Sequence, residues 1–243
     1  MKLVRPACLS LLLAAIAAAA GDASDPQLLA EQVRRLDDRD PHVRDAARTA
    51  LMGLKVDDAA YLKRAIVAAG PVRPHRAELL REVMTYVYTR QAIAQIPRKN
   101  NGFLGVTFDR GVLFEPDDAP PGQIVSGLVP GFVGARYLAA GDILLGFTFD
   151  GRTEWVGRTQ LVVDIIGKLP AGKSVDVLVS RDGQSLTIPI TLDGRPDDTP
   201  VENGPADLNT LGWDGRMAKF ADDAEAAAEQ EVAREFGRLV GEG

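Results

Sequence analysis

Two glycines interrupt a short apolar stretch, Gly102-Phe103-Leu104-Gly105-Val106, which continues into Thr107 and Phe108. Glycine lets the backbone make a turn and approach a neighbouring group closely, because it carries no Cβ atom. The residues after the second glycine have the composition of a strand. We therefore expect an exposed turn at 102–105 that leads into a strand at the edge of a sheet.

Downstream of this turn, the sequence continues with strand signals. An Asp-Gly pair at 182–183 separates two alternating segments, which is a strong signal for a β-hairpin. One helical segment, near 160–169, interrupts the set. The further segments with strand composition are 123–129, 142–147, 174–179 and 185–190.

Residues 25–96 have the period of helices. Asp25-Pro26 and Asp40-Pro41 are helix-start signals, each an N-cap residue followed by proline. Pro41-His42 aligns with Pro74-His75 at an offset of 33 residues, and such a period is typical of stacked helix pairs. The stretch 40–47 resembles the second helix of a HEAT-like repeat. We expect a compact, HEAT-like unit of four helices over 25–96.

The N-terminal segment predicts export. Lys2 and Arg5 precede an apolar run at 9–20, and small residues stand before Gly21. This order is typical of a secretory signal peptide over 1–20, with an uncleaved anchor helix as the alternative. We expect a periplasmic or secreted bacterial protein with no stable membrane insertion after cleavage. The single cysteine, Cys8, lies inside this segment, so the mature chain has no disulfide and no thiolate site.

The C-terminal segment has a different composition from the rest. The chain has a net charge of −6, and residues 194–243 hold 12 acidic against 5 basic residues. Residues 194–216 are rich in Pro, Gly, Asp and Asn, which predicts a disordered linker. Residues 217–240 have the spacing of an amphipathic helix. This charge balance argues against nucleic acid as a partner.

Four segments in the same order resemble a PDZ domain of the kind attached to bacterial HtrA-type proteases. They are the 102–106 turn, the 122–131 strand and turn, the 141–151 strand with its Gly-Asp and Asp-Gly pairs, and the 169–183 helix end and hairpin. The resemblance covers residues 101–193. It implies an α+β multidomain chain, in which the helical unit precedes a partly open β-barrel or sandwich with a groove helix, followed by the linker and the C-terminal helix.

The resemblance also implies a binding site for a peptide C-terminus. The amides of Leu104, Gly105 and Val106 would surround the terminal carboxylate as an anion-binding nest. The strand that follows would pair with the extended peptide. The residues implied in peptide binding are Phe103, Leu104, Gly105, Val106, Thr107, Phe108, Leu161, Val162, Ile165, Ile166 and Leu169.

Two alternatives apply to this site. For any single apolar residue of the set, Val162 or Ile166 above all, a place in the core is at least as good an interpretation. The long acidic loop at 109–121 departs from the family pattern and lies where it would cover or extend the groove. A tryptophan in place of Gly105 is expected to fill the ligand's space and leave the fold intact.

The sequence shows little sign of a catalytic site. The only histidines, His42 and His75, lie in the helical region, and no Gly-x-Ser-x-Gly motif is present. The chain has no room for the separate Ser-His-Asp catalytic domain of HtrA-type proteases. Two histidines without clustered carboxylates make a poor metal site, and no glycine-rich phosphate loop occurs. We expect no enzyme activity, no metal and no cofactor.

The sequence thus favours an exported adaptor that binds protein or peptide C-termini, or extended apolar segments. An envelope protease is a candidate partner. A second hypothesis is a structural scaffold in which the loop or the C-terminal helix closes the groove and the helical repeat makes the contacts. A protease remnant or an accessory subunit of an enzyme is a third.

Overall fold

The computed structural model describes residues 26–54, 59–70, 73–114, 121–157, 159–197 and 213–240. They form an α+β protein with antiparallel sheets, as the sequence predicts. The chain divides into two compact units, one of residues 1–80 with 234–243 and one of residues 81–233. The division falls inside a helix, between Leu80 and Arg81.

The first unit is helical. Its helices are α2 (Pro26–Arg35), α3 (Pro41–Leu51), α4 (Ala59–Ala69) and the beginning of α5 (Pro74–Ala94). The Asp40 carboxylate caps α3 by accepting the His42 amide at 2.9 Å, as the Asp-Pro signal predicts. The α2 helix packs against α3 and α4 around Val33, Leu36 and Leu51. The four predicted helices are present, and their HEAT-like character stays a prediction.

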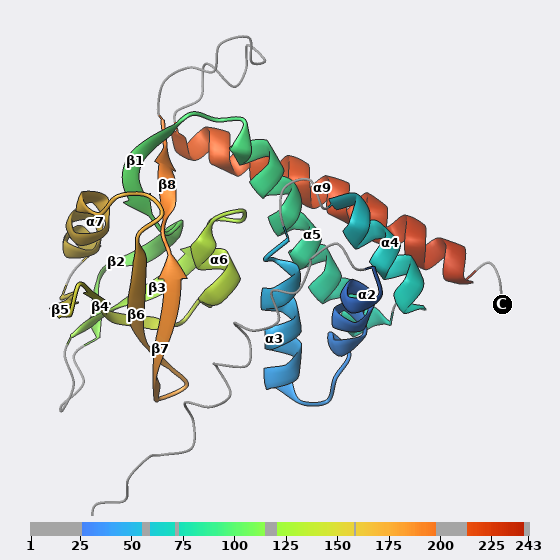
Figure 1. Ribbon diagram of the computed structural model, residues 1–243, viewed down its shortest axis with the longest axis horizontal. Helices are drawn as coiled ribbons and strands as arrows, with labels where there is room; N and C mark the ends of the chain where they lie inside the picture. The colour runs from blue at the N-terminus through green and yellow to red at the C-terminus, as the bar shows by residue number, and fades with distance from the viewer. Residues whose placement is uncertain are drawn as a thin grey trace, which may run out of the picture. The chain divides into compact units, whose positions relative to one another are not determined.

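The second unit contains a six-stranded antiparallel sheet, whose main path runs β2-β3-β4-β6-β7 while β5 pairs with β4 (Figure 1). Because β2 and β7 each have one strand partner among the described residues, the sheet is not a closed barrel. The strands are β2 (Val106–Phe114), β3 (Gly122–Leu128), β4 (Ile143–Phe149), β5 (Arg152–Trp155), β6 (Ser174–Arg181) and β7 (Gln184–Thr191).

Two Asp-Gly turns join neighbouring strands. Asp150 and Asp182 have φ values of 50° and 51°, and the glycines after them have 73° and 75°. Positive φ at both central residues is what a two-residue hairpin with the natural strand twist requires. The predicted hairpin at 182–183 is therefore confirmed, and a second one links β4 to β5.

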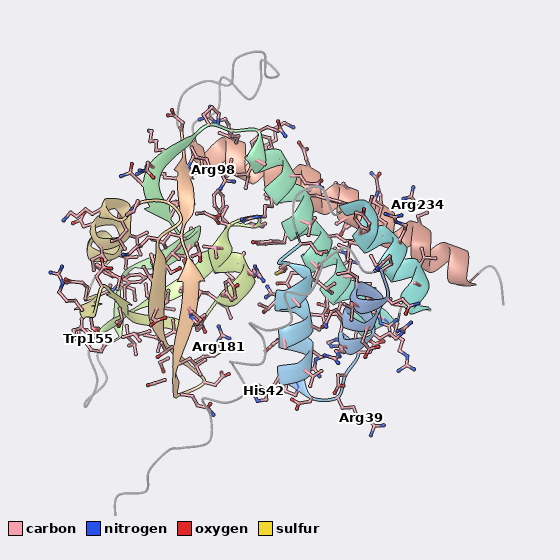
Figure 2. The ribbon with its side chains drawn as sticks, in the orientation of Figure 1. Arg39, His42, Arg98, Trp155, Arg181 and Arg234 are labelled. Carbon is pink, nitrogen blue, oxygen red and sulfur yellow. The ribbon has the colours of Figure 1, made fainter. Side chains whose placement is uncertain are left out.

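The second unit also contains two short helices and an extra strand pair. They are α6 (Val133–Tyr137), α7 (Thr159–Lys168), and the pair of β1 (Arg98–Phe103) with β8 (Asp193–Pro196); Figure 2 labels Arg98, the first residue of β1. One apolar core lies between the sheet and α7. Its largest fully buried members include Phe147, Leu144 and Ile190.

A second, smaller apolar cluster surrounds Phe132. This ring is fully buried and packs with Ile93 of α5, with Ile96, and with Met217 of α9 (Trp213–Val240). The described parts of α5 and α9 that belong to this unit are thus packed onto the sheet domain. The sequence alone had placed both helices outside the 101–193 domain.

Two predicted segments, the loop and the linker, differ in extent from what the structure shows. β2 continues through Phe114 into the predicted 109–121 loop. The predicted linker at 194–216 begins inside β8 and ends inside α9. Residues 1–20 and 198–212, which carry the predicted signal peptide and most of the linker, lie outside the described residues.

Candidate functional site

The predicted carboxylate-binding turn joins the two sheets of the second unit. β1 ends at Phe103, β2 begins at Val106, and Leu104 and Gly105 connect them. Gly105 has a φ of +71°, a conformation that residues with a Cβ rarely adopt. Both connecting residues are buried.

The carbonyl groups of this turn are held from one side. The Gly134 amide donates to the Leu104 carbonyl at 2.8 Å, and the Val129 amide donates to the Gly105 carbonyl at 2.8 Å. In a planar trans peptide the N–H group points opposite to the C=O group. The N–H groups of Gly105 and Val106 therefore point away from the 129–134 segment.

Two backbone amides of this turn, those of Leu104 and Gly105, have no acceptor among the described residues. Buried N–H groups in proteins are nearly always paired, so two adjacent buried donors without an acceptor call for an external partner. Successive amides of this kind form a small concave site that suits an anion such as a carboxylate.

The strand after the turn has a free edge. Among the described strands, β2 pairs only with β3. Val129, which follows β3, binds the Gly105 carbonyl, so the Val106 amide is directed to the opposite side. Thr107 is exposed, and its hydroxyl lies 3.3 Å from the Ser126 hydroxyl on β3. An unpaired strand edge is the element to which an extended peptide adds.

The predicted apolar residues of the site separate into distinct environments. Leu104, Val162 and Ile166 are buried in the core at 3%, 4% and 4% exposure, as the alternative interpretation allowed. Four predicted residues are partly buried and pack against that same core, where they remain accessible: Val106, Phe108, Ile165 and Leu169.

For two further predicted residues, the structure describes no side-chain contact with this core. Phe103 packs instead edge-on against Phe132, with ring centroids 4.8 Å apart. The side chain of Leu161 lies outside the described residues.

Contacts of β1 fix α7 next to the turn. The Gly102 amide donates to the Leu169 carbonyl at 2.7 Å, and the Asn101 side chain donates to the Gly167 carbonyl at 2.6 Å. Both acceptors are carbonyls at the C-terminal end of α7, which lack partners within the helix. No local signal indicated this role of Asn101, because its partner is 66 residues away.

The expectation for a substitution at Gly105 was wrong. A Cβ atom at this position would collide with Cβ of Phe132 and lie 2.8 Å from its Cγ. It points into the Phe132 cluster and not toward a ligand. A tryptophan at this position would therefore disrupt the fold.

Neither predicted covering segment lies over this site in the described residues. The strand part of the acidic loop, up to Phe114, pairs with β3 at Gly122 and Gln123. Met217 and Phe220 at the start of α9 belong to the Phe132 cluster and not to the core beside α7. Residues 115–120 lie outside the described residues.

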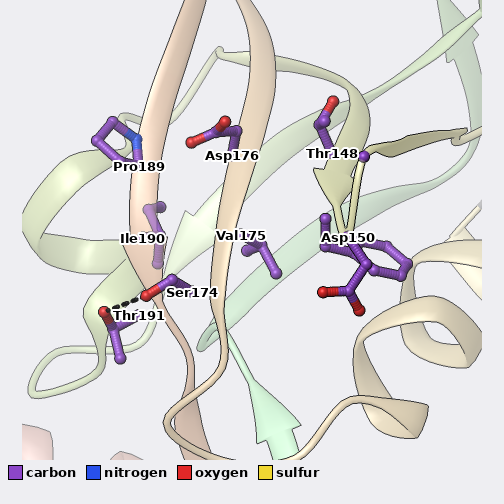
Figure 3. A pocket seen from close by; sticks show the side chains of 10 residues that line it. Thr148, Asp150, Ser174, Val175, Asp176, Pro189, Ile190 and Thr191 are labelled. Atoms are coloured by element: carbon purple, nitrogen blue, oxygen red, sulfur yellow. Dashed lines mark hydrogen bonds between the residues drawn. The ribbon is translucent and has the colours of Figure 1, made fainter.

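A pocket of about 480 Å³ lies elsewhere on the second unit (Figure 3). It is formed by the end of β4 with Asp150, by Ser174 and Asp176 of β6, and by Thr191 of β7. None of the predicted peptide-binding residues lines it. Strand addition uses an open sheet edge and needs no enclosed cavity, so this pocket does not decide the location of the site.

Metal-binding side chains are not gathered in the parts of the chain that the structure describes. His42 and His75 are exposed at the first turns of α3 and α5. Within those same parts, no helix combines the length and apolar character needed to cross a membrane.

Comparison with known proteins gives a partial likeness. No model of a known protein family matches the chain. Over 97 residues the chain is 33% identical to a probable periplasmic serine endoprotease, DegP-like, of Marinomonas sp. (strain MWYL1). The match covers 39% of this chain and 20% of that protein, so the chain spans about a fifth of the length of the relative.

Proposed function

We propose that the second unit is a PDZ-type domain that binds protein or peptide C-termini, and that the chain acts as an adaptor and not as an enzyme. In the described part of the chain, the amides of the buried residues Leu104 and Gly105 have no acceptor, and the strand that follows them pairs along one edge alone. This observation supports the proposal most. A terminal carboxylate fits the amides, and the peptide backbone fits the edge.

The partly buried side chains next to the edge favour an apolar terminal residue. Val106 and Phe108 come from β2, and Ile165 and Leu169 come from α7. A valine or leucine side chain at the peptide's end would cover this surface and remove it from water. The predicted residues Leu104, Val162 and Ile166 would support the surface from beneath.

The likeness to a periplasmic serine endoprotease agrees with this proposal, since the sequence resembles PDZ domains of bacterial HtrA-type proteases. We propose a periplasmic location, with exposed C-termini of envelope proteins as ligands and an envelope protease as a candidate partner. The helical first unit, HEAT-like by its sequence, would supply a second contact surface.

Titration of the full-length protein with a ten-residue peptide ending in valine tests the proposal. We expect binding in the micromolar range, about −8 kcal/mol. The same peptide with an amidated C-terminus loses the charge that the amides bind. A hydrogen bond to a charged group contributes about 1.5–3 kcal/mol, so amidation should weaken binding by roughly tenfold to a hundredfold. Equal affinity for both peptides, or binding of neither, would overturn the proposal.

A further inference from the structure

A partly buried ion pair between α5 and β8 holds the segment that supports the carboxylate-binding turn. Asp193 is 8% exposed, and its Oδ1 lies 3.2 Å from Nη2 of Arg90 on α5. The same carboxylate accepts a hydrogen bond from the Val133 amide at 2.7 Å, and the Arg90 guanidinium donates one to the Gly131 carbonyl at 2.9 Å. Two oppositely charged side chains therefore hold both ends of the turn at 131–133.

This turn is also pressed against α5 by its backbone. A Cβ atom on Gly131 would lie 2.8 Å from the backbone nitrogen of Arg90, so only glycine permits so close an approach to the helix. Phe132, the next residue, is fully buried among Ile93, Ile96 and Met217. The turn thus has a position that the helices define.

The supported segment in turn orients the donors of the proposed site. Val129 and Gly134, on either side of the turn, bind the carbonyls of Gly105 and Leu104. Because each peptide unit is planar, a rotation of either carbonyl changes the direction of the next amide by the same angle. A displacement of the 129–134 segment would therefore turn the Gly105 and Val106 amides away from a bound carboxylate.

Such an ion pair contributes little net stability compared with apolar side chains in the same space, because Asp193 loses most of its hydration and Arg90 loses part of it. Its effect here is geometric, since the carboxylate and the guanidinium each bind a specific backbone group of the turn. We propose that Arg90 and Asp193 are positioning residues for the carboxylate-binding turn, so that recognition of a free peptide C-terminus depends on a helix outside the PDZ-like segment. This inference rests on the proposed function.

The test compares Arg90→Met and Asp193→Asn with a matched control, Arg181→Met. Arg181 forms an ion pair with Asp142 of similar burial, with side-chain exposures of 31% and 1% against 31% and 9% for Arg90 and Asp193. Its partner holds the Ala139 amide and not the 131–133 turn. All variants are made in the full-length protein, and their circular dichroism spectra establish that they are folded.

The first readout is the ratio of dissociation constants for the amidated and the free-acid peptide. In Arg90→Met and Asp193→Asn we expect this ratio to fall by about tenfold, which corresponds to roughly 1.4 kcal/mol of carboxylate recognition. In Arg181→Met it should stay within about twofold of wild type, although the protein is destabilised. An unchanged ratio in both folded Arg90 and Asp193 variants would overturn the inference.

The second readout requires no peptide. Hydrogen exchange at the Val129 and Gly134 amides, measured by NMR, reports directly on the bonds that hold the turn. We expect both amides to exchange faster in Arg90→Met and Asp193→Asn, relative to the overall stability of each variant, and not in Arg181→Met. Equal protection in all variants would also overturn the inference. A wild-type protein that binds neither peptide, in contrast, would overturn the proposed function.

Discussion

At the scale of single residues, Gly105 and Gly172 both have positive φ, +71° and +80°, but only the first is crowded. Gly105→Ala combines backbone strain of about 1–2 kcal/mol with a collision against Phe132 of roughly 1–3 kcal/mol. We expect a loss in the free energy of unfolding of about 2–5 kcal/mol, measured by urea denaturation. A Cβ atom added at Gly172 would have no heavy atom within 4 Å, so Gly172→Ala should reduce the free energy of unfolding by the backbone strain alone. Equal losses in both variants would contradict the crowding at Gly105.

Tyr86 gives a pH-dependent prediction. Burial raises the pKa of its hydroxyl, an effect that Asp193 and Tyr137 reinforce and that Arg90 and Arg136 oppose. A raised pKa in the folded state means that folding favours the protonated form, so its contribution to stability is complete below the ordinary value of about 10 and is lost as the pH rises above it. Between pH 8 and pH 10.5 the wild type should therefore lose more stability than Tyr86→Phe. Urea denaturation of both proteins at the two pH values measures this, and parallel losses would contradict it.

Residues that act locally were accessible from the sequence, and residues that act at a distance were not. The glycines at 102 and 105 indicated the turn because only glycine suits a positive φ or a close backbone approach. Arg90 and Asp193 are 103 residues apart, and nothing near either of them indicates the other. Nothing near Gly105 in the sequence indicated that it packs against Phe132, and for this reason the expectation for a tryptophan at 105 was wrong.

At the scale of elements, the side chains of α7 differ in burial from one face of the helix to another. Val162 and Ile166 are buried, Ile165 is partly buried, and Val163 is 50% exposed. Ile165→Gln should weaken binding of a valine-ended peptide by about tenfold, since the transfer of an apolar side chain contributes roughly 1.5–3 kcal/mol. Val163→Gln is the matched control and should leave the dissociation constant unchanged. Equal effects of both substitutions in a peptide titration would mean that α7 does not face the ligand.

Elements with a strong period or a capping signal were predicted well. The helix-start pairs Asp25-Pro26 and Asp40-Pro41 precede α2 and α3, and the Asp-Gly pair at 182–183 forms the β6–β7 hairpin. β1 and β8 were missed, because Arg98–Asn101 and Asp193–Pro196 have the composition of turns and become strands only by pairing with each other. That pairing joins segments at opposite ends of the domain, and a local pattern contains no information about it.

At the scale of the whole molecule, the compact unit that carries the proposed site begins at Arg81 and ends at Ala233, well outside the segment 101–193 that resembles a PDZ domain. The resemblance rests on motifs between residues 101 and 193, and the helices packed on Phe132 lie outside that segment. The 81–233 fragment should therefore bind peptide, whereas a 97–197 fragment keeps the turn and the free edge but loses the contacts that hold them.

This difference gives a prediction for the two fragments. The 97–197 fragment lacks Ile93, Ile96 and Met217, which cover Phe132, as well as Arg90, which holds Gly131. Burial of each apolar side chain contributes about 1.5–3 kcal/mol, so the loss of the three amounts to several kcal/mol. The total stability of a domain is only about 5–15 kcal/mol, so we expect this fragment to be marginally folded. Its Asp193 carboxylate would also lose Arg90, although it would keep Arg98, whose Nη1 lies 3.5 Å from Oδ1. Urea denaturation should show a clearly lower unfolding midpoint than for 81–233, and a dye that binds exposed apolar surface should fluoresce with the shorter fragment alone. If both fragments unfold at the same urea concentration and bind the same peptide equally, then α5 and α9 are accessory to the domain, and the Phe132 cluster does not support the site.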